Sequence, residues 1–467
     1  MIERLNIFST RDMVRESYRL GDIPDTAQAY KTLARIALPA VIEMMSIAFI
    51  GMTSTAMVGK MGPEAVAAVG LTGQPRMLFM AMIFALNVGV TAIISRRKGE
   101  GNQEAARTVL RQSISIALVM GIIMTALAII LSTPVMKLSG AKSDTIGPAT
   151  LYFRISSASL VFSSLTSTIC AAQRGVGNTR VTMVVNIAAN IVNVTFHFLL
   201  IEGRFFFPRM GVAGAGTALA LSAAAGAALA VTSLLKKGEY LRISRRDNWK
   251  LDPGIMNLIV KIGGNSVFEQ ICLRIGFLIY SRVIAELGTE AYAAHQIASQ
   301  MMNISFTFAD GLAVATTSLV GQYLGMKRSD LSILYGKVGQ RVAFAVSIIL
   351  MTVSFTTRFW FPTWFTEDAE VIRLAAGVIL VLGFIQPFQT SSIVLAGSLR
   401  GAGDVRYVAI TMLISVTFIR PALAYLLVFP LGVGLAGAWL AMLFDQGLRF
   451  FLVYFRFVRG KWMNIRI

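Results

Sequence analysis

Charged residues are scarce in this sequence, and the residues that build catalytic or metal centres are scarcer still. Asp, Glu, Lys and Arg make up 14% of the 467 residues, against roughly 25% in soluble domains. The chain has two histidines, His197 and His295, and two cysteines, Cys170 and Cys272. Both cysteines fall in apolar stretches, so we expect no structural disulfide. Polytopic membrane enzymes cluster His, Asp or Ser at one membrane face, and two distant histidines disfavour that class.

A nucleotide-binding loop is also missing. The segment RGVGNTR, residues 174–180, contains Gly-x-Gly, but no strand precedes it and no Lys-Ser/Thr follows it, as a P-loop would require. We interpret its glycines as a tight turn. Any transport against a gradient therefore needs an energy source other than ATP.

Apolar residues, by contrast, are abundant. Hydrophobic residues make up 55% of the chain, and the mean hydropathy is +0.67. Apolar runs of roughly 20 residues or more recur about twelve times. They lie near 33–58, 66–94, 108–132, 148–171, 181–202, 212–235, 259–284, 292–320, 334–358, 374–397, 405–428 and 435–457. Backbone groups in hydrocarbon need internal partners, so these runs predict an all-α integral membrane protein rather than a barrel.

The net charge of +19 is explained by membrane topology and not by nucleic acid. With twelve spans and an inside N-terminus, roughly 31 of the 43 Lys and Arg fall on the cytoplasmic side. We therefore expect a multi-pass protein of a bacterial cytoplasmic membrane with both termini in the cytoplasm. No cleavable signal peptide is visible. Residues 1–32 are expected to be a cytoplasmic segment, in which basic and apolar residues between Arg4 and Leu20 could form a short amphipathic helix on the inner leaflet.

An internal repeat organises the chain. Glu43 of ALPAVIEMM matches Glu269 of NSVFEQICL, Thr91 matches Thr317, and RGVGNTR matches the RGAGDVR of residues 400–406. All three matches share one offset of about 226 residues, and such a fixed offset is typical of a duplicated module. We call this spacing the repeat offset. We predict two pseudo-symmetric six-helix lobes in parallel orientation, at 33–235 and 259–461, with a linker at 236–258 and a tail at 462–467.

The two repeated carboxylates are the strongest site candidates. Glu43 lies roughly 15 Å into the first span at 1.5 Å per residue, which is near the midplane. A carboxylate at that depth costs at least about 2.5–3.5 kcal/mol unless it is paired, protonated or facing water. A pair between Glu269 and Arg274 is disfavoured, because residues five apart on a helix point about 140° away from each other. We therefore expect Glu269 to have no cationic partner and to face a central cleft.

Other polar residues in spans leave two interpretations open. Asn186, Asn190, Asn193 and His197 share one helix face, which fits either a cavity wall or hydrogen bonds between helices. Asp310 has no acidic counterpart in the first copy, and Arg274 is a plausible partner for it. For Asp445 and Arg449, four residues apart, an internal pair is favoured over a site.

The residues also resemble a known family. The segments TAMVGKMGPEAVAAVG, QRGVGNTRVTMVVNIAANIVN, AYAAHQIA with TTSLVGQYLG, and LRGAGDVR together are similar to the multidrug and toxic compound extrusion (MATE) transporters across nearly the full length. The resemblance implies twelve helices in two lobes that export organic cations against protons or sodium. Ser54, His197 and Gln389 stand where many members or one bacterial branch carry Asp, whereas Glu269 matches the span-seven Glu of that branch.

The sequence thus predicts a cation antiporter without a cofactor, with small cationic substrates, a lipid environment and a monomeric state. Glu269 is expected to alternate between a proton or sodium and the substrate, with Asp310 adjusting its affinity. Sodium near Glu269 and proton coupling both stay open. A lipid-linked saccharide flippase is the closest alternative, but it needs a strongly cationic cavity, for which only Arg154, Arg274 and Arg420 are candidates. A channel would not need two lobes that each hold a buried acid.

Overall fold

The computed structural model describes residues 8–10, 12–59, 63–141, 145–205, 207–236, 238–244 and 247–465. These residues form helices and no strand. The helices up to the linker are α1 (Thr26–Gly59), α2 (Pro63–Gly99), α3 (Gln103–Ile130), α4 (Ser132–Leu138), α5 (Ile146–Ser157), α6 (Ser159–Gly175), α7 (Thr179–Glu202) and α8 (Gly211–Leu235). Those after it are α9 (Pro253–Ala285), α10 (Thr289–Gly325), α11 (Ser329–Thr357), α12 (Ala369–Gly401), α13 (Val405–Met412), α14 (Arg420–Val428) and α15 (Gly434–Val458). A π-helical stretch, Leu413–Ile419, joins α13 to α14.

The expected spans are present. Within the described residues, ten spans are long and apolar enough to cross a membrane, and α5 with α6, bent by 42°, would form an eleventh. The helix α9 is outside that set because Asn265, Glu269, Gln270 and Arg274 lower its hydropathy. Its 33 residues are still long enough to cross the roughly 30 Å hydrocarbon core.

The chain divides into two compact units, and the divisions fall inside helices. Unit 1 consists of Met1–Val41 and Asn265–Ile467, and unit 2 of Ile42–Gly264. Each of α1 and α9 therefore begins in one unit and continues into the other. The predicted lobe at 33–235 contains α1 from residue 33 on, and the predicted lobe at 259–461 contains α9 from residue 259 on. The units differ from these lobes because the first half of each helix belongs to the other unit.

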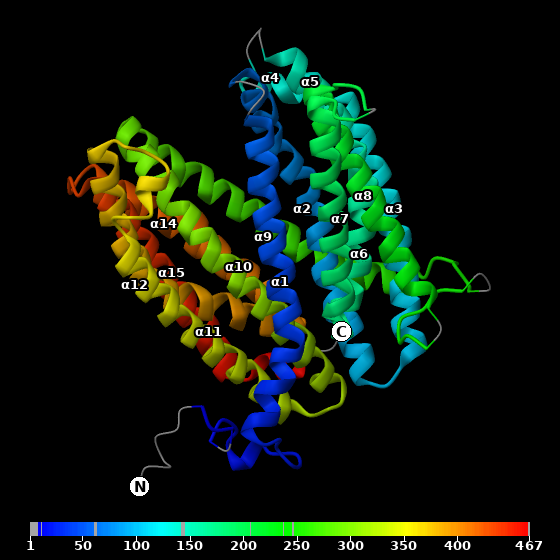
Figure 1. Ribbon diagram of the computed structural model, residues 1–467. Helices are drawn as coiled ribbons and strands as arrows, with labels where there is room; N and C mark the ends of the chain where they lie inside the picture. The colour runs from blue at the N-terminus through cyan, green and yellow to red at the C-terminus, as the bar shows by residue number, and fades with distance from the viewer. Residues whose placement is uncertain are drawn as a thin grey trace. The chain divides into compact units, whose positions relative to one another are not determined.

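Unit 2 is built on α2, α3, α6, α7 and α8, which pack side by side (Figure 1). Small residues let the backbones approach, as membrane helices require. An added Cβ at Gly214 of α8 would lie 2.6 Å from the carbonyl oxygen of Leu200 in α7. A close backbone contact at a glycine also joins α2 to α6, where a Cβ at Gly175 would lie 3.0 Å from the Thr91 carbonyl oxygen.

Unit 1 is built on α10, α11, α12 and α15 in the same way. A Cβ at Gly401 of α12 would collide with the carbonyl oxygen of Thr317 in α10. These two residues are the counterparts of Gly175 and Thr91 at the repeat offset. The equivalent contacts support the predicted duplication at the level of individual residues.

The first half of each long helix packs in the unit of the other copy. In unit 1, Leu33 and Ala37 of α1 share a buried cluster with Leu312 and Ala315 of α10. In unit 2, the carbonyl oxygen of Ile259 in α9 lies against Gly89 of α2. The positions correspond between the copies, since the repeat offset relates Leu33 to Ile259 and Gly89 to Ala315.

The segment before α1 continues this docking. Of the amphipathic helix that we expected there, residues 1–7 and 11 lie outside the described part of the chain, and the described residues 12–25 contain no α-helix. We call residues 12–25 the N-terminal strap. Met13 and Val14 are buried in the same cluster as Leu312 and Ala315. The Lys337 ammonium donates to the Met13 carbonyl oxygen at 2.7 Å. The backbone N–H of Leu20 donates to Asp330 at 3.1 Å. The strap contains a single 3-10 turn, Glu16–Tyr18.

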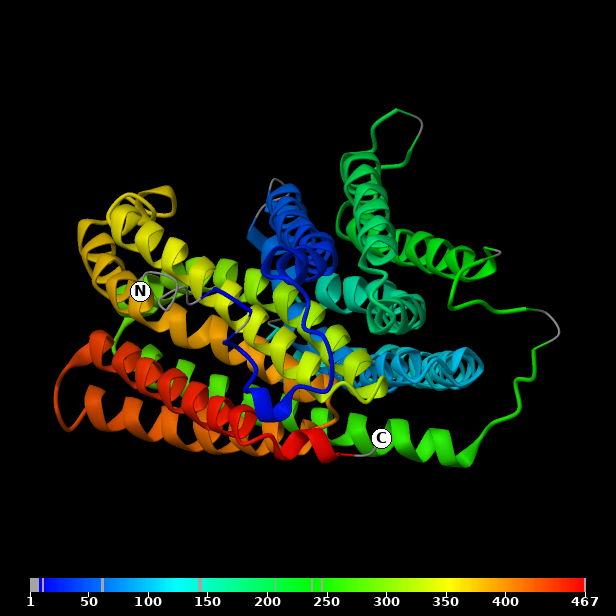
Figure 2. The same ribbon diagram turned by 90° about the horizontal axis from the view of Figure 1, so that it is seen from below.

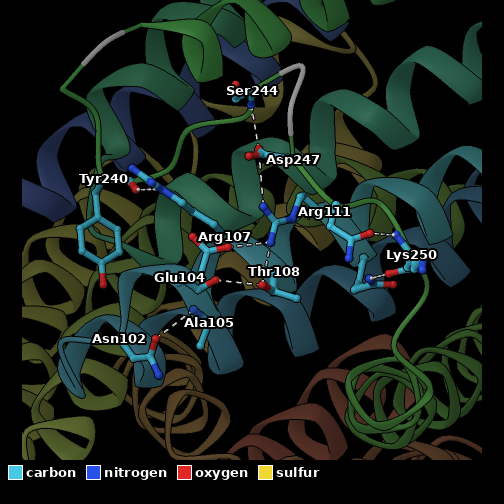
Figure 3. Close-up of polar contacts among 12 residues, drawn as sticks. Asn102, Glu104, Ala105, Arg107, Thr108, Arg111, Tyr240, Ser244, Asp247 and Lys250 are labelled. Atoms are coloured by element: carbon cyan, nitrogen blue, oxygen red, sulfur yellow. Dashed lines mark hydrogen bonds and ion pairs between the residues drawn. The ribbon is translucent and has the colours of Figure 1, made fainter.

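The linker before α9 is docked on α3 in unit 2. We call its described residues, 238–244 and 247–252, the linker strap, and Figure 2 shows them as extended chain between α8 and α9. Arg107 donates to the Tyr240 carbonyl oxygen at 3.2 Å and Gln112 to the Lys250 carbonyl oxygen at 2.6 Å (Figure 3). Arg111 forms an ion pair with Asp247 at 3.5 Å. Because Arg111 and Lys337 are equivalent in the repeat, the two straps hold equivalent helices.

Candidate cation site

The repeated carboxylate of the first copy, Glu43, is sealed inside unit 2. Its side chain is 1% exposed and accepts three hydrogen bonds from α6 and α7. Arg174 donates at 3.0 Å, Thr182 at 2.5 Å and Asn186 at 2.8 Å. The charge is thereby paired with a guanidinium and satisfied by two neutral donors.

The turn between α6 and α7 positions these donors. Arg174 occupies the last turn of α6 and Thr182 the first turn of α7. Thr91 of α2 donates its hydroxyl to the Ala171 carbonyl oxygen at 3.0 Å, which fixes the end of α6. Glu43 therefore lies within the reach of one arginine side chain from this turn.

Glu269, the repeated carboxylate of the second copy, also has an arginine partner. Arg400, in the last turn of α12, donates to its Oε1. The expectation of an unpaired Glu269 is wrong, although the exclusion of Arg274 as its partner agrees with the contact found. Arg174 and Arg400 are themselves matched at the repeat offset, and each is 131 residues from its carboxylate. The two copies therefore contain the same ion pair.

The two ion pairs differ in their neutral donors. The counterparts of Thr182 and Asn186 at the repeat offset are Val408 and Met412, and neither side chain donates a hydrogen bond. Among the described residues, Arg400 is the partner found for the Glu269 carboxylate. Glu269 is as deeply buried as Glu43, at 2% exposure, but it has one donor in place of three.

Asp310, the candidate carboxylate without an acidic counterpart in the first copy, is exposed. It lies on α10, about four helical turns from the nearer helix end, and its side chain is exposed on unit 1. It is close enough to Arg400 for the arginine charge to act on it. The counterpart in the first copy, Phe84, is also exposed, so the repeat presents this position in the same way.

The polar face of α7 is mostly used inside unit 2. Asn193 donates to the Ser222 hydroxyl at 3.3 Å, and the His197 ring bonds to the Asn193 carbonyl oxygen at 2.9 Å. Both side chains are buried, so these two residues fit the interpretation of bonds within the bundle. Asn190 is half-buried, and its amide nitrogen has no partner among the described residues.

The remaining candidates occupy different surroundings. Gln389 is fully buried on α12, and neither of its amide atoms has a partner among the described residues. Arg274 lies on α9. Ser54 lies on α1, but its side chain is outside the part of the chain that the structure describes. Arg400 pairs with Glu269 and its charge acts on Asp310, and Arg400 was not among the predicted site residues.

A second buried charge cluster lies further along unit 1. Asp445 of α15 pairs with Arg420 at 2.5 Å and with Arg449 at 3.6 Å, which confirms the predicted internal pair with Arg449. The charges of Glu269 and Arg400 also act on Arg449. Together with Asp310, these side chains form a connected set of three carboxylates and three arginines, which has no net charge.

No group of three or more His, Cys, Asp or Glu side chains that could hold a metal ion occurs among the described residues.

Comparisons with known proteins show the family of the chain. The family model described as MatE matches residues 39–199 and 266–426, one segment in each copy. A probable multidrug resistance protein NorM of Thermotoga maritima is 29% identical over 445 residues, which cover 92% of this chain and 93% of that protein. The uncharacterized transporter YisQ of Bacillus subtilis is 27% identical over 440 residues, covering 93% and 96%. The multidrug resistance protein PmpM of Pseudomonas aeruginosa is 26% identical over 389 residues, covering 82% and 80%.

Solved structures show the same fold. An outward-facing multidrug resistance MATE family transporter of the MOP superfamily has a TM-score of 0.86 at 21% identity, covering 93% of this chain and 97% of that one. A MOP superfamily transporter from Pyrococcus furiosus has a TM-score of 0.85 at 22% identity, covering 94% and 97%. The predicted fold class, an all-α membrane protein of the two-lobe type, is confirmed.

Proposed function

The chain belongs to the MatE family, and on that basis we propose that it is a secondary active antiporter that exports organic cations in exchange for protons or sodium. Membership makes it a membrane transporter and not an enzyme. The proposal adds alternating access between two lobes, a bacterial cytoplasmic membrane, cytoplasmic termini and a monomeric state. The drug-efflux names of several relatives support small-molecule substrates.

The exposure of Asp310 carries this proposal. Its position is at least about 22 Å from either end of α10 at 1.5 Å per residue, which places it within the hydrocarbon depth. An ionised carboxylate does not face lipid at that depth, so an exposed one there requires an aqueous space. A single negative charge in an aqueous space with low-dielectric walls attracts cations. Asp310 is therefore the proposed contact for the cationic substrate.

The two repeated carboxylates receive different roles. Glu269, with a single arginine partner and Asp310 nearby, is proposed as the site of the coupling proton or sodium ion. Glu43 has three donors and is proposed as a structural anchor for α1 in unit 2. This division replaces the symmetric roles suggested by the repeat alone.

The flippase alternative is less well supported by the charges. A lipid-linked pyrophosphate needs cations that are free to bind it. Arg420 is held by Asp445, and Arg154 donates to the Ser132 hydroxyl at 2.7 Å. These two deep arginines are used internally, whereas Asp310 offers a negative charge.

Efflux from proteoliposomes tests the proposal. The purified protein is reconstituted, a proton or sodium gradient is imposed, and the movement of ethidium is recorded. We expect Asp310→Asn to lower gradient-driven transport at least about tenfold, because the variant keeps the shape of the side chain and removes its charge. Glu290→Gln is the matched control, since Glu290 is an exposed carboxylate in the first turn of the same helix. Equal transport by Asp310→Asn and the parent would refute the assignment, and absence of gradient-driven transport in the parent would refute antiport.

A further inference from the structure

The Glu269–Arg400 ion pair lies at the carboxylate proposed above as the site of the coupling ion. Arg400 donates to the carboxylate of Glu269, and its charge also acts on the exposed Asp310. One guanidinium thus bonds to the buried carboxylate, and its charge also acts on the exposed one.

Arg400 is held loosely enough to move. Its side chain is 22% exposed, and it is the penultimate residue of α12, directly before Gly401. Gly401 packs against the Thr317 backbone, so the helix end is fixed, and a displacement of the Arg400 guanidinium from Glu269 needs only a change of side-chain rotamer. The backbone stays in place and the charge can shift between the two acids.

In the first copy, the equivalent ion pair between Glu43 and Arg174 is supported by additional donors. There the carboxylate keeps Thr182 and Asn186 as additional donors, so losing Arg174 would still leave two hydrogen bonds. In the second copy those donors are replaced by Val408 and Met412. When Arg400 is displaced, the negative charge of the Glu269 carboxylate is no longer paired, and a cation can take the place of the guanidinium.

We propose that Arg400 is a tethered cation, which neutralises Glu269 while the transporter is empty and is displaced toward Asp310 or solvent when a transported cation binds. The inference rests on the proposed function and adds a residue that sets affinity. Because the connected carboxylates and arginines of unit 1 already sum to zero charge, an incoming cation competes with Arg400 instead of filling an unpaired charge. Weakly binding cations are rejected by this competition, which makes Arg400 a specificity-determining residue.

Binding measurements on Arg400→Gln test the inference. The probe is radiolabelled tetraphenylphosphonium, measured by equilibrium dialysis with the full-length protein in detergent. We expect the affinity to rise at least about tenfold, because a neighbouring positive charge has been removed from a partly desolvated site. Arg174→Gln is the matched control at the same place in the other copy, and its affinity should equal that of the parent.

Two further variants keep the test decisive if Arg400→Gln does not fold. Glu269→Gln with Arg400→Gln removes both charges, and should recover the stability of the parent without the gain in affinity. Arg400→Lys keeps the charge with fewer donors, and should bind the probe with an affinity between those of the parent and Arg400→Gln. Folded Arg400→Gln with unchanged or weaker binding would overturn the inference, as would Arg400→Lys with parent affinity if Arg400→Gln does not fold.

The transport assay separates this outcome from failure of the proposed function. Gradient-driven efflux by the parent together with unchanged binding by Arg400→Gln would refute the tethered cation and leave antiport standing. A parent that neither transports nor binds the probe would refute both.

Discussion

Replacing each repeated glutamate by glutamine should destabilise the protein unequally. Both changes keep the size of the side chain and remove its charge, leaving an arginine without its counter-ion. In unit 2, Glu43→Gln also disturbs the bonds from Thr182 and Asn186, since an amide offers a single acceptor oxygen. In unit 1, Glu269→Gln disturbs the bond from Arg400 alone.

The magnitudes follow from burial and partner number. Breaking a buried ion pair costs about 3–5 kcal/mol, but the arginines are 17% and 22% exposed, and solvent reduces the cost. We expect Glu43→Gln to lower the free energy of unfolding by about 2–4 kcal/mol and Glu269→Gln by about 1–2 kcal/mol. Removing the charge of Glu43 should therefore cost roughly twice as much free energy of unfolding as removing the charge of Glu269.

Denaturant unfolding in detergent, followed by circular dichroism, measures both values under one condition. Glu43→Gln combined with Arg174→Met removes the whole pair, and should recover most of the lost stability because no charge is left unpaired. Equal costs for the two glutamates, or a larger cost for Glu269→Gln, would refute the argument that neutral donors distinguish the copies.

Three other predictions concern transport, packing and the N-terminal strap. Glu269→Gln should abolish gradient-driven ethidium efflux in proteoliposomes while the folded fraction measured by gel filtration stays above half; transport at the parent rate would contradict the coupling role. Gly401→Ala should lower the free energy of unfolding by at least about 2 kcal/mol in the same assay, because the added Cβ meets backbone. Gly377→Ala on the same helix, where nothing lies within 4 Å of the added Cβ, should be neutral or stabilising by up to about 1 kcal/mol. Similar values for both variants would argue against the close approach of α10 and α12. Asp330→Ala should make trypsin cleave the strap several-fold faster on denaturing gels, because Leu20 and Arg328 lose their acceptor, while Glu370→Ala, which removes an exposed pair, should leave the rate unchanged.

The sequence predicted the duplication. The same repeat also contains a signal for the contact between Glu269 and Arg400. Matching RGVGNTR to RGAGDVR placed Arg174 and Arg400 at equivalent positions, and Glu43 and Glu269 were already matched. The pairing between them spans 131 residues, and local helix geometry carries no sign of it. A repeat in which an acid and a base keep their offset in both copies is itself a signal of contact, and it could have identified Arg400.

The straps could not be predicted by the same comparison. Residues 12–25 and 238–252 share no recognisable similarity, and both are polar enough to suggest solvent exposure. Their docking depends on backbone carbonyl groups that accept from Lys337, Arg107 and Gln112, and every residue type has a carbonyl group. The hydrogen bond to Asp330 also raises the pKa of Arg328 above its usual value, so the cation that holds the Asp22 carbonyl oxygen stays charged.

The docking of the N-terminal strap also sets an order of events during synthesis. Met13 is the first buried apolar residue among those described in unit 1, but its partner Lys337 is 324 residues later in the chain. At about 5–20 residues per second, roughly 16–65 seconds pass between the translation of the two. For that interval the first apolar span must be held by the insertion machinery or by lipid, since the surface that will cover it has not been made. Closing so long a loop is also a slow step, so completion of the N-terminus is among the last events in the assembly of this protein.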